Sequence, residues 1–130
     1  MSAINTILAC IGINLKTLKP QPTVEGHSTF GGYSYLAVKP IALSMVSEIA
    51  RDAETQGFPI SGIGGVTNWR DAVEFMALGA GNVQVCTAAM VYGFRVVEDM
   101  ISGLNDWMDD KGYARLDDFV GLAVPNVTDW

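Results

Sequence analysis

The sequence predicts an α/β protein built on parallel strands. Three observations support this class: short apolar runs of strand length alternate with longer stretches of helical period, the alternation occurs three times, and glycine-rich turns separate the elements. Consecutive strand–helix units place their strands parallel, with right-handed crossovers between them. The 130 residues are 49% hydrophobic, which is enough for the packed core of a single domain.

The first unit is predicted to be a strand, a loop and a helix. Residues 4–13 (INTILACIGI) are mostly apolar and rich in β-branched side chains, which indicates a strand buried on both faces. Residues 14–39 are rich in Gly and Pro and have no period, so we expect a long binding loop. Pro40 suits a first helical turn, and apolar residues then recur at helical spacing as far as Gly57.

The second unit follows the same order. Residues 58–63 (FPISGI) predict a short strand, and Gly64-Gly65 a turn. Thr67 or Asn68 is the expected cap of a helix that ends near Gly79.

The third unit completes the pattern. Residues 82–86 (NVQVC) predict a strand, and a helix is expected from residue 90 or 93 to residue 111, closed by Gly112. Beyond it we expect one short helix near residues 116–122 and then an extended tail.

Composition narrows the classes of partner. Eight basic and fourteen acidic side chains give a formal charge of -6 with no basic cluster, which argues against nucleic acid and anionic membranes. No window approaches the roughly 20 apolar residues of a membrane span, so a cytoplasmic protein is expected. Cys10 and Cys86 have no metal-ligand spacing, so we expect two free thiols and no metal site.

The ends of the second and third strands carry the strongest chemical signal. At Gly64-Gly65 backbone N–H groups can approach an anion without interference from a Cβ atom, with the dipole of the following helix facing it. The next strand ends in Cys86-Thr87, and phosphates in (β/α)₈ barrels are often held by two successive loops of this kind. A tight turn explains the glycine pair equally well on its own.

Three long segments resemble the dihydropyrimidine dehydrogenase family, in particular its bacterial NAD-dependent subunit type. They are GGYSYLAVKPIALSMVSEIAR, PISGIGGVTNWRDAVEFMALGAGNVQVCTAAMVYGFRVVEDMISGL and GLAVPNVTDW. The resemblance implies a (β/α)₈ TIM barrel that binds FMN and reduces the 5,6 double bond of uracil or thymine. It also implies that the chain is a half barrel, with strands six to eight in residues 1–112 and a tail at 113–130 that leads to a missing domain.

The resemblance also implies site residues. Asn5 and Thr6 match residues that bind the pyrimidine, although a polar cap closing a strand is the other reading of this pair. The flavin-phosphate residues implied in the same way are Gly64, Gly65, Val66, Cys86 and Thr87. Tyr35 stands where the family has the third glycine of a GG-x-x-G run, and Lys39 is a candidate for the vicinity of the flavin or a solvated lysine.

No residue is assigned to catalysis, because the family's general-acid cysteine has no counterpart here. Electrons from NAD(P)H and iron-sulfur clusters are expected to come only through missing domains or a partner subunit. The expected partners are a pyrimidine base, the rest of the barrel or a second copy of the chain, and an electron-transfer protein. Two alternatives remain: another phosphate- or nucleotide-binding α/β protein, and a non-catalytic assembly fragment.

Overall fold

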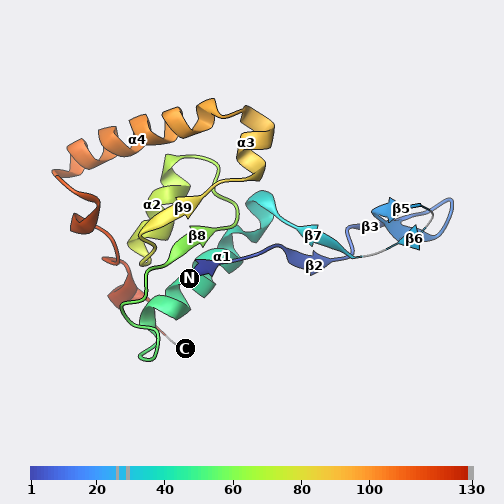
Figure 1. The fold of residues 1–130 in the computed structure, drawn as a ribbon, viewed down its shortest axis with the longest axis horizontal. Coiled ribbons are helices and arrows are strands. Elements are labelled where there is room, and N and C mark those ends of the chain that lie inside the picture. The colour runs from blue at the N-terminus through green and yellow to red at the C-terminus, as the bar shows by residue number, and fades with distance from the viewer. Residues whose placement is uncertain (26, 29, 129–130) are drawn as a thin grey trace.

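The body of the molecule is a parallel sheet covered by helices on one face (Figure 1). The computed structural model describes residues 1–25, 27–28 and 30–128. Strands β1 (Ser2–Ala3), β8 (Ser61–Ile63) and β9 (Asn82–Gln84) lie in the order β1-β8-β9, and both pairs are parallel. The predicted α/β class with parallel strands is therefore confirmed.

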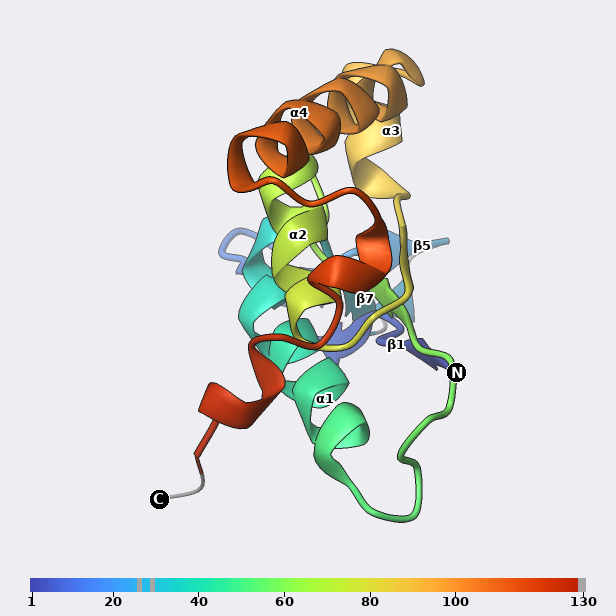
Figure 2. The same ribbon diagram turned by 90° about the vertical axis from the view of Figure 1, so that its left-hand side faces the viewer.

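In the described residues, four α-helices lie on the covered side of this sheet. They are α1 (Lys39–Arg51), α2 (Trp69–Ala77), α3 (Thr87–Tyr92) and α4 (Arg95–Lys111). Helix α1 contacts β1 and β8, α2 contacts β9, and α4 packs on α2. Figure 2 shows α1, α2 and α4 stacked in that order, with α3 beside the start of α4.

The sheet has one apolar and one polar face. Ala3, Gly62 and Val83 are in register and face the helices, whereas Ser2, Ser61 and Asn82 form the neighbouring row on the open face. Gly62 lets Phe75 pack directly on the sheet, because a Cβ atom at position 62 would lie 2.6 Å from the Phe75 ring. The core between sheet and helices contains Ala42, Val46, Ile60, Val66, Ala72, Phe75, Ala80, Val96 and Met100.

The prediction of one buried strand over residues 4–13 is wrong. The strand β1, which pairs with β8, ends at Ala3. In the segment that follows, the N–H of Ile4 still donates to the carbonyl of Ile63 in β8 at 2.7 Å. The chain then leaves the body and enters β2 (Ile7–Ala9), where Leu8 is 72% exposed. A continuous apolar run does not distinguish a buried strand from an exposed one, since the burial is decided by distant parts of the chain.

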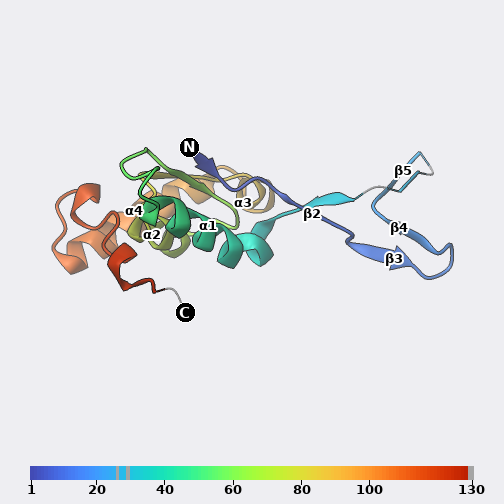
Figure 3. The ribbon, with the colours of Figure 1, turned by 90° about the horizontal axis from the view of Figure 1, so that it is seen from below.

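The region predicted as a long loop forms an antiparallel arm instead. Strand β2 pairs with β7 (Gly31–Tyr33), and beyond them lie the pairs β3 (Gly12–Asn14) with β4 (Lys19–Gln21) and β5 (Thr23–Val24) with β6 (His27–Ser28). We call the described residues between 7 and 33 the arm. Figure 3 shows it extending away from the body. Strands of two or three residues are too short to produce a period in the sequence, which explains why they were missed.

Helix boundaries follow the sequence with two exceptions. Asn68 caps α2 and Gly112 ends α4 with a left-handed φ of 72°, both as predicted. Helix α1 ends at Arg51 and not at Gly57, because Asp52 turns to an extended conformation and its side chain accepts from the N–H of Glu54 at 2.7 Å. The last helix is divided into α3 and α4 at Gly93, where φ is 76°.

The segment after α4 packs back on the body. Phe119 is 2% exposed and meets Trp107 edge-to-face with ring centroids 5.0 Å apart. The N–H of Gly121 donates to the carbonyl of Met76 and that of Ala123 to the carbonyl of Ala77, both at 2.9 Å, so the extended tail predicted beyond residue 122 is wrong. Two 3₁₀ turns occur instead, η2 (Leu116–Asp118) and η3 (Val124–Asn126). Trp130 lies outside the described residues.

The structure bears on the expectations about membrane spans and about the two cysteines. No helix in the described part of the chain has both the length and the apolar character needed to cross a bilayer. Cys10 and Cys86 are free and exposed, as predicted.

Candidate functional site

A pocket of about 430 Å³ lies where the three parallel strands end. The carboxyl ends of parallel strands are the usual place for ligands in α/β folds. All seven residues named as site residues from the sequence line this one pocket: Asn5 and Thr6 after β1, Gly64, Gly65 and Val66 after β8, and Cys86 and Thr87 after β9. The fold thus brings together residues that lie up to 82 positions apart.

The loop after β8 needs its two glycines for packing. Gly64 and Gly65 have φ values of 126° and 79°, which side chains disfavour. A Cβ atom would lie 2.8 Å from the Ala42 Cβ atom at position 64 and 2.7 Å from the Lys39 Cβ atom at position 65. The reading of this pair as a tight turn against α1 is therefore sufficient to explain why glycine stands there.

The same loop presents free donors. Among the described residues, the backbone N–H groups of Gly65 and Val66 donate no hydrogen bond within the protein, whereas the N–H of Gly64 belongs to the ladder between β8 and β9. Backbone N–H groups that are withdrawn from water without a partner are costly, so such a group in a pocket marks a place for a ligand or water.

The first turn of α3 lines the pocket, whereas the start of α2 does not. Thr87 and Ala88, in the first turn of α3, line the pocket, and no hydrogen bond of the Thr87 hydroxyl is found within the described chain. In α2 the side chain of Asn68 accepts from the N–H of Arg70 at 2.9 Å, and Asn68 does not line the pocket. The start of α2 is therefore capped internally and outside the pocket lining, and an action of its dipole on an anion stays a prediction.

Asn5 and Thr6 are positioned by local contacts. The Oδ1 atom of Asn5 accepts from the N–H of Thr6 at 2.7 Å, and its Nδ2 atom has no partner among the described residues. A Cβ atom at Gly32 would lie 2.5 Å from Thr6 Oγ1, so the glycine of β7 leaves the room that Thr6 occupies. The free amide N–H₂ of Asn5 is available to an acceptor in the pocket.

Tyr35 occupies a position that favours glycine. It lies in η1 (Tyr35–Val38), lines the pocket and has a φ of 70°. Its hydroxyl is 3.1 Å from that of Tyr92 in α3, and this hydrogen bond, together with desolvation, raises the pKa of Tyr35 above its ordinary value. The left-handed backbone explains how a glycine can stand at this position in the family that the sequence resembles.

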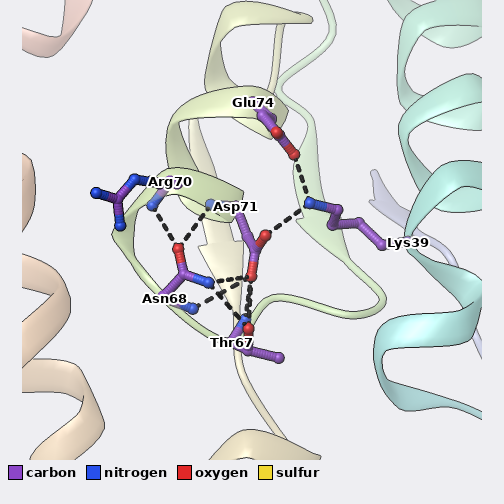
Figure 4. A network of polar contacts seen from close by, with 6 residues as sticks. All are labelled: Lys39, Thr67, Asn68, Arg70, Asp71 and Glu74. Atoms are coloured by element: carbon purple, nitrogen blue, oxygen red, sulfur yellow. Dashed lines mark hydrogen bonds and ion pairs between the residues drawn. The ribbon is translucent and has the colours of Figure 1, made fainter.

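A polar network holds the β8–α2 loop in place (Figure 4). The Nζ atom of Lys39 is 2.7 Å from both Asp71 Oδ1 and Glu74 Oε2. The other carboxylate oxygen of Asp71 accepts from the N–H of Thr67 at 2.8 Å and from its hydroxyl at 2.7 Å. Lys39 is thus paired with two carboxylates, so its reading as a solvated lysine is wrong. It is not among the residues that line the pocket, and its place in the vicinity of a flavin stays a prediction.

Asp71 was not named from the sequence. It is 4% exposed, and partial burial acts to raise its pKa, but hydrogen bonds from Lys39 and Thr67 outweigh burial and leave the pKa below its ordinary value. The spacing Asn68-x-x-Asp71 is a sequence signal from which this role could have been predicted, since it is typical of a capping box.

The lining as a whole suits an anion or a polar ring. No Asp or Glu is among the described residues that line the pocket, and the donors come from backbone N–H groups, hydroxyls and side-chain amides. A pocket of this size lies within the range for small-molecule sites, about 300 to 1,000 Å³.

Residues 1–108 match the family model of dihydroorotate dehydrogenase. The chain belongs to the dihydroorotate dehydrogenase family. Within it, the chain is 46% identical over 127 residues to the NAD-dependent dihydropyrimidine dehydrogenase subunit PreA of Escherichia coli K12, covering 98% of this chain and 31% of that protein.

Two further relatives extend the comparison. The chloroplastic NADP⁺ dihydropyrimidine dehydrogenase of Arabidopsis thaliana is 45% identical over 131 residues, covering 98% of this chain and 31% of that protein. The catalytic subunit of dihydroorotate dehydrogenase B (NAD⁺) from Pyrococcus horikoshii is 38% identical over 124 residues, covering 95% and 38%. This member of the dihydroorotate dehydrogenase family therefore spans about a third of the length of these curated relatives.

Proposed function

We propose that the chain supplies the flavin-phosphate site and part of the pyrimidine site of a dihydropyrimidine dehydrogenase. One observation carries the proposal: free donors from the ends of β8 and β9 and from Asn5 meet in one pocket that has no acidic lining residue among those described. The similarity to dihydropyrimidine dehydrogenases over 98% of the chain supports the same assignment.

The residues present fit FMN in their donor chemistry. The backbone N–H groups of Gly65 and Val66 and the hydroxyl of Thr87 hold the phosphate, with Gly64 leaving the backbone accessible beside it and Cys86 contributing backbone at the start of α3. Asn5 and Thr6 hold the pyrimidine, Asn5 by donating its free amide N–H₂ to a ring carbonyl. When bound and reduced by electrons that come from NAD(P)H, FMN would supply hydride to the 5,6 double bond of uracil or thymine.

The half-barrel architecture belongs to the same proposal. A sheet of three parallel strands with helices on one face corresponds to strands six to eight of a (β/α)₈ barrel, with residues 1–112 in the barrel and 113–130 leading beyond it. The rest of the barrel or a second copy then completes the cavity. NAD(P)H and iron-sulfur clusters act through other domains or a partner subunit, in keeping with the word subunit in the name of the Escherichia coli relative.

Binding of FMN tests the phosphate assignment. We expect micromolar or weaker affinity for the chain alone, since much of the flavin ring would lack contacts. Gly64→Val should abolish binding, but this change also drives a side chain into α1. Thr87→Val avoids that problem and should weaken binding by about tenfold, the order expected for one hydrogen bond to a charged group. Thr128→Val, an exposed change away from the pocket, is the matched control.

Uracil-dependent oxidation of NAD(P)H tests the proposal that the catalytic acid lies outside this chain. Reduction needs an acid placed within a few tenths of an ångström on the ring face opposite the hydride donor, and we assign no residue of this chain to that task. The chain alone is expected to show no turnover, and turnover should appear with the preceding half of a relative and an electron donor. Turnover by the chain alone would contradict the proposal.

A second candidate function is a non-catalytic phosphate- or nucleotide-binding assembly module. The exposed apolar side chains of the arm favour it, with Leu15 84% exposed and Leu18 76% exposed, because such surfaces commonly contact other chains. Phosphate binding without any response to uracil, even after recombination, would favour this function.

A further inference from the structure

The open face of the sheet carries a connected row of four polar side chains that no assignment above uses. Ser61 Oγ donates to Asn82 Oδ1 across β8 and β9. Gln84 Nε2 donates to Ser61 Oγ at 2.8 Å and to Ser2 Oγ at 3.0 Å. One residue of each parallel strand is thus joined through the amide of Gln84.

The donor and acceptor in each of these hydrogen bonds follow from the number of protons that each side chain can donate. Ser61 has a single hydroxyl proton, and it is used on Asn82, so Ser61 must accept from Gln84. Both N–H protons of the Gln84 amide are then committed, one to Ser61 and one to Ser2. The Oε1 atom of Gln84 and the hydroxyl proton of Ser2 are left without a partner in the described part of the chain.

These two groups belong to the pocket. Ser2 and Gln84 line it, whereas Ser61 and Asn82 do not. The Oε1 atom is bonded to the same amide carbon as the Nε2 atom that contacts Ser2, so a free acceptor and a free donor are neighbours. An adjacent acceptor and donor complement an adjacent N–H and C=O, which is the edge of a cyclic amide or imide.

We propose that Gln84 and Ser2 recognise the imide edge of the ring held in this pocket, with Gln84 accepting from the ring N–H and Ser2 donating to the ring carbonyl. Ser61 and Asn82 are positioning residues, because they hold the amide of Gln84 in the orientation that presents its oxygen. The inference rests on the proposed function, since both a flavin and a pyrimidine base carry such an edge.

Methylation of the ring nitrogen tests the recognition directly. FMN is compared with 3-methyl-FMN, and uracil with 1,3-dimethyluracil, by titration of the whole chain. We expect the methylated ring to bind about tenfold more weakly, the effect of one lost hydrogen bond with its acceptor left unpaired. The pair of ligands that shows the difference identifies whether the flavin or the base occupies the edge.

Variants of the two residues should affect that difference in distinct ways, because only Gln84 contacts the ring N–H that is methylated. Gln84→Met keeps the length of an exposed side chain and should bind parent and methylated ligands equally, and Ser2→Ala should weaken binding of both members of a pair alike. Gln56→Met, at an exposed glutamine away from the pocket, should behave as the unsubstituted chain. Inorganic phosphate should bind all of these variants equally.

The outcomes separate the two proposals. Equal discrimination by the unsubstituted chain and by Gln84→Met, or no discrimination by the unsubstituted chain, would overturn the recognition by Gln84 and leave the phosphate assignment standing. Failure of the unsubstituted chain to bind FMN and uracil at all would overturn both.

Discussion

At the scale of single residues, Asp71 determines the shape of the β8–α2 loop. Its carboxylate joins Lys39 of α1 to Thr67 and Asn68 ahead of α2, and it is 4% exposed. The free donors of Gly65 and Val66 lie between this anchor and β8. A residue outside the pocket therefore holds the part of the pocket that is proposed to bind phosphate.

Removing the charge of Asp71 should destabilise the chain. Asp71→Asn leaves Lys39 and the Thr67 donors with weaker partners, which should lower the free energy of unfolding at pH 7 by about 1 to 3 kcal/mol. Urea unfolding measures this change. Asp110→Asn, an exposed carboxylate on α4, is the control and should change the free energy by less than about 0.5 kcal/mol.

The pKa of Asp71 gives this effect a defined pH dependence. Because the folded-state pKa is depressed, the stabilisation is present above the unfolded pKa of about 3.9 and is lost as pH falls through the folded value. The difference in unfolding free energy between Asp71→Asn and the unsubstituted chain should therefore shrink below about pH 4. A difference that stays constant down to pH 2 would contradict the assignment.

At position 35 a glycine variant should be more stable than an alanine variant, which is the reverse of the usual order. A non-glycine residue at φ 70° costs about 1 to 2 kcal/mol, and Tyr35→Ala keeps that cost while losing the ring and its contact with Tyr92. Tyr35→Gly removes the cost, so we expect it to be more stable than Tyr35→Ala by about 1 kcal/mol. Thermal unfolding of the two variants compares them, and an alanine variant at least as stable as the glycine variant would show that the backbone is not strained.

At the scale of elements, α4 packs on α2 through Gly103. A Cβ atom at this position would overlap the indole ring of Trp69, whose side chain is partly buried against the core. Close packing of α4 against α2 therefore depends on the missing side chain. The cluster of Trp107, Tyr113 and Phe119 then extends the same interface toward the C-terminal segment.

Gly103→Ala should destabilise the chain even though alanine favours helix. Helix propensity alone would add about 1 kcal/mol. Overpacking against Trp69 should cost about 1 to 3 kcal/mol, so we expect a net loss in urea unfolding. Ser102→Ala is exposed on the same helix and should be neutral or slightly stabilising. A gain of stability in Gly103→Ala would mean that Trp69 moves aside freely.

At the scale of the whole molecule, the sheet is open at both edges. In the described chain β1 and β9 each pair on one side only, which leaves rows of N–H and C=O groups without partners. The arm, helix α3 and the turn after it also expose apolar side chains, with Met90 in α3 81% exposed and Phe94 in the turn 86% exposed. Surfaces of this kind are normally covered by another chain or by another part of the same one.

We therefore expect the chain to self-associate at micromolar concentration. A two-fold dimer that joins the open edges is the simplest arrangement. Sedimentation velocity measures the state, and addition of the preceding half of a relative should replace self-association if the same edges are used. A well-folded monomer would count against this expectation.

The sequence by itself determined the alternation of strands and helices, because apolar periodicity and helix caps are local properties. Through the family resemblance it also pointed to Asn5, Thr6, Gly64, Gly65, Val66, Cys86 and Thr87, and the structure places all seven around one pocket. What these residues bind is still a prediction.

Only the tertiary structure decided the remaining features. Residues 4–13 divide between the sheet and the exposed arm, Lys39 is bound by Asp71 and Glu74, and the row from Asn82 to Ser2 crosses three strands. These outcomes depend on which distant segments meet. A local pattern records the chemistry of a side chain but not the partner that will satisfy it, and burial and hydrogen bonding are properties of that partnership.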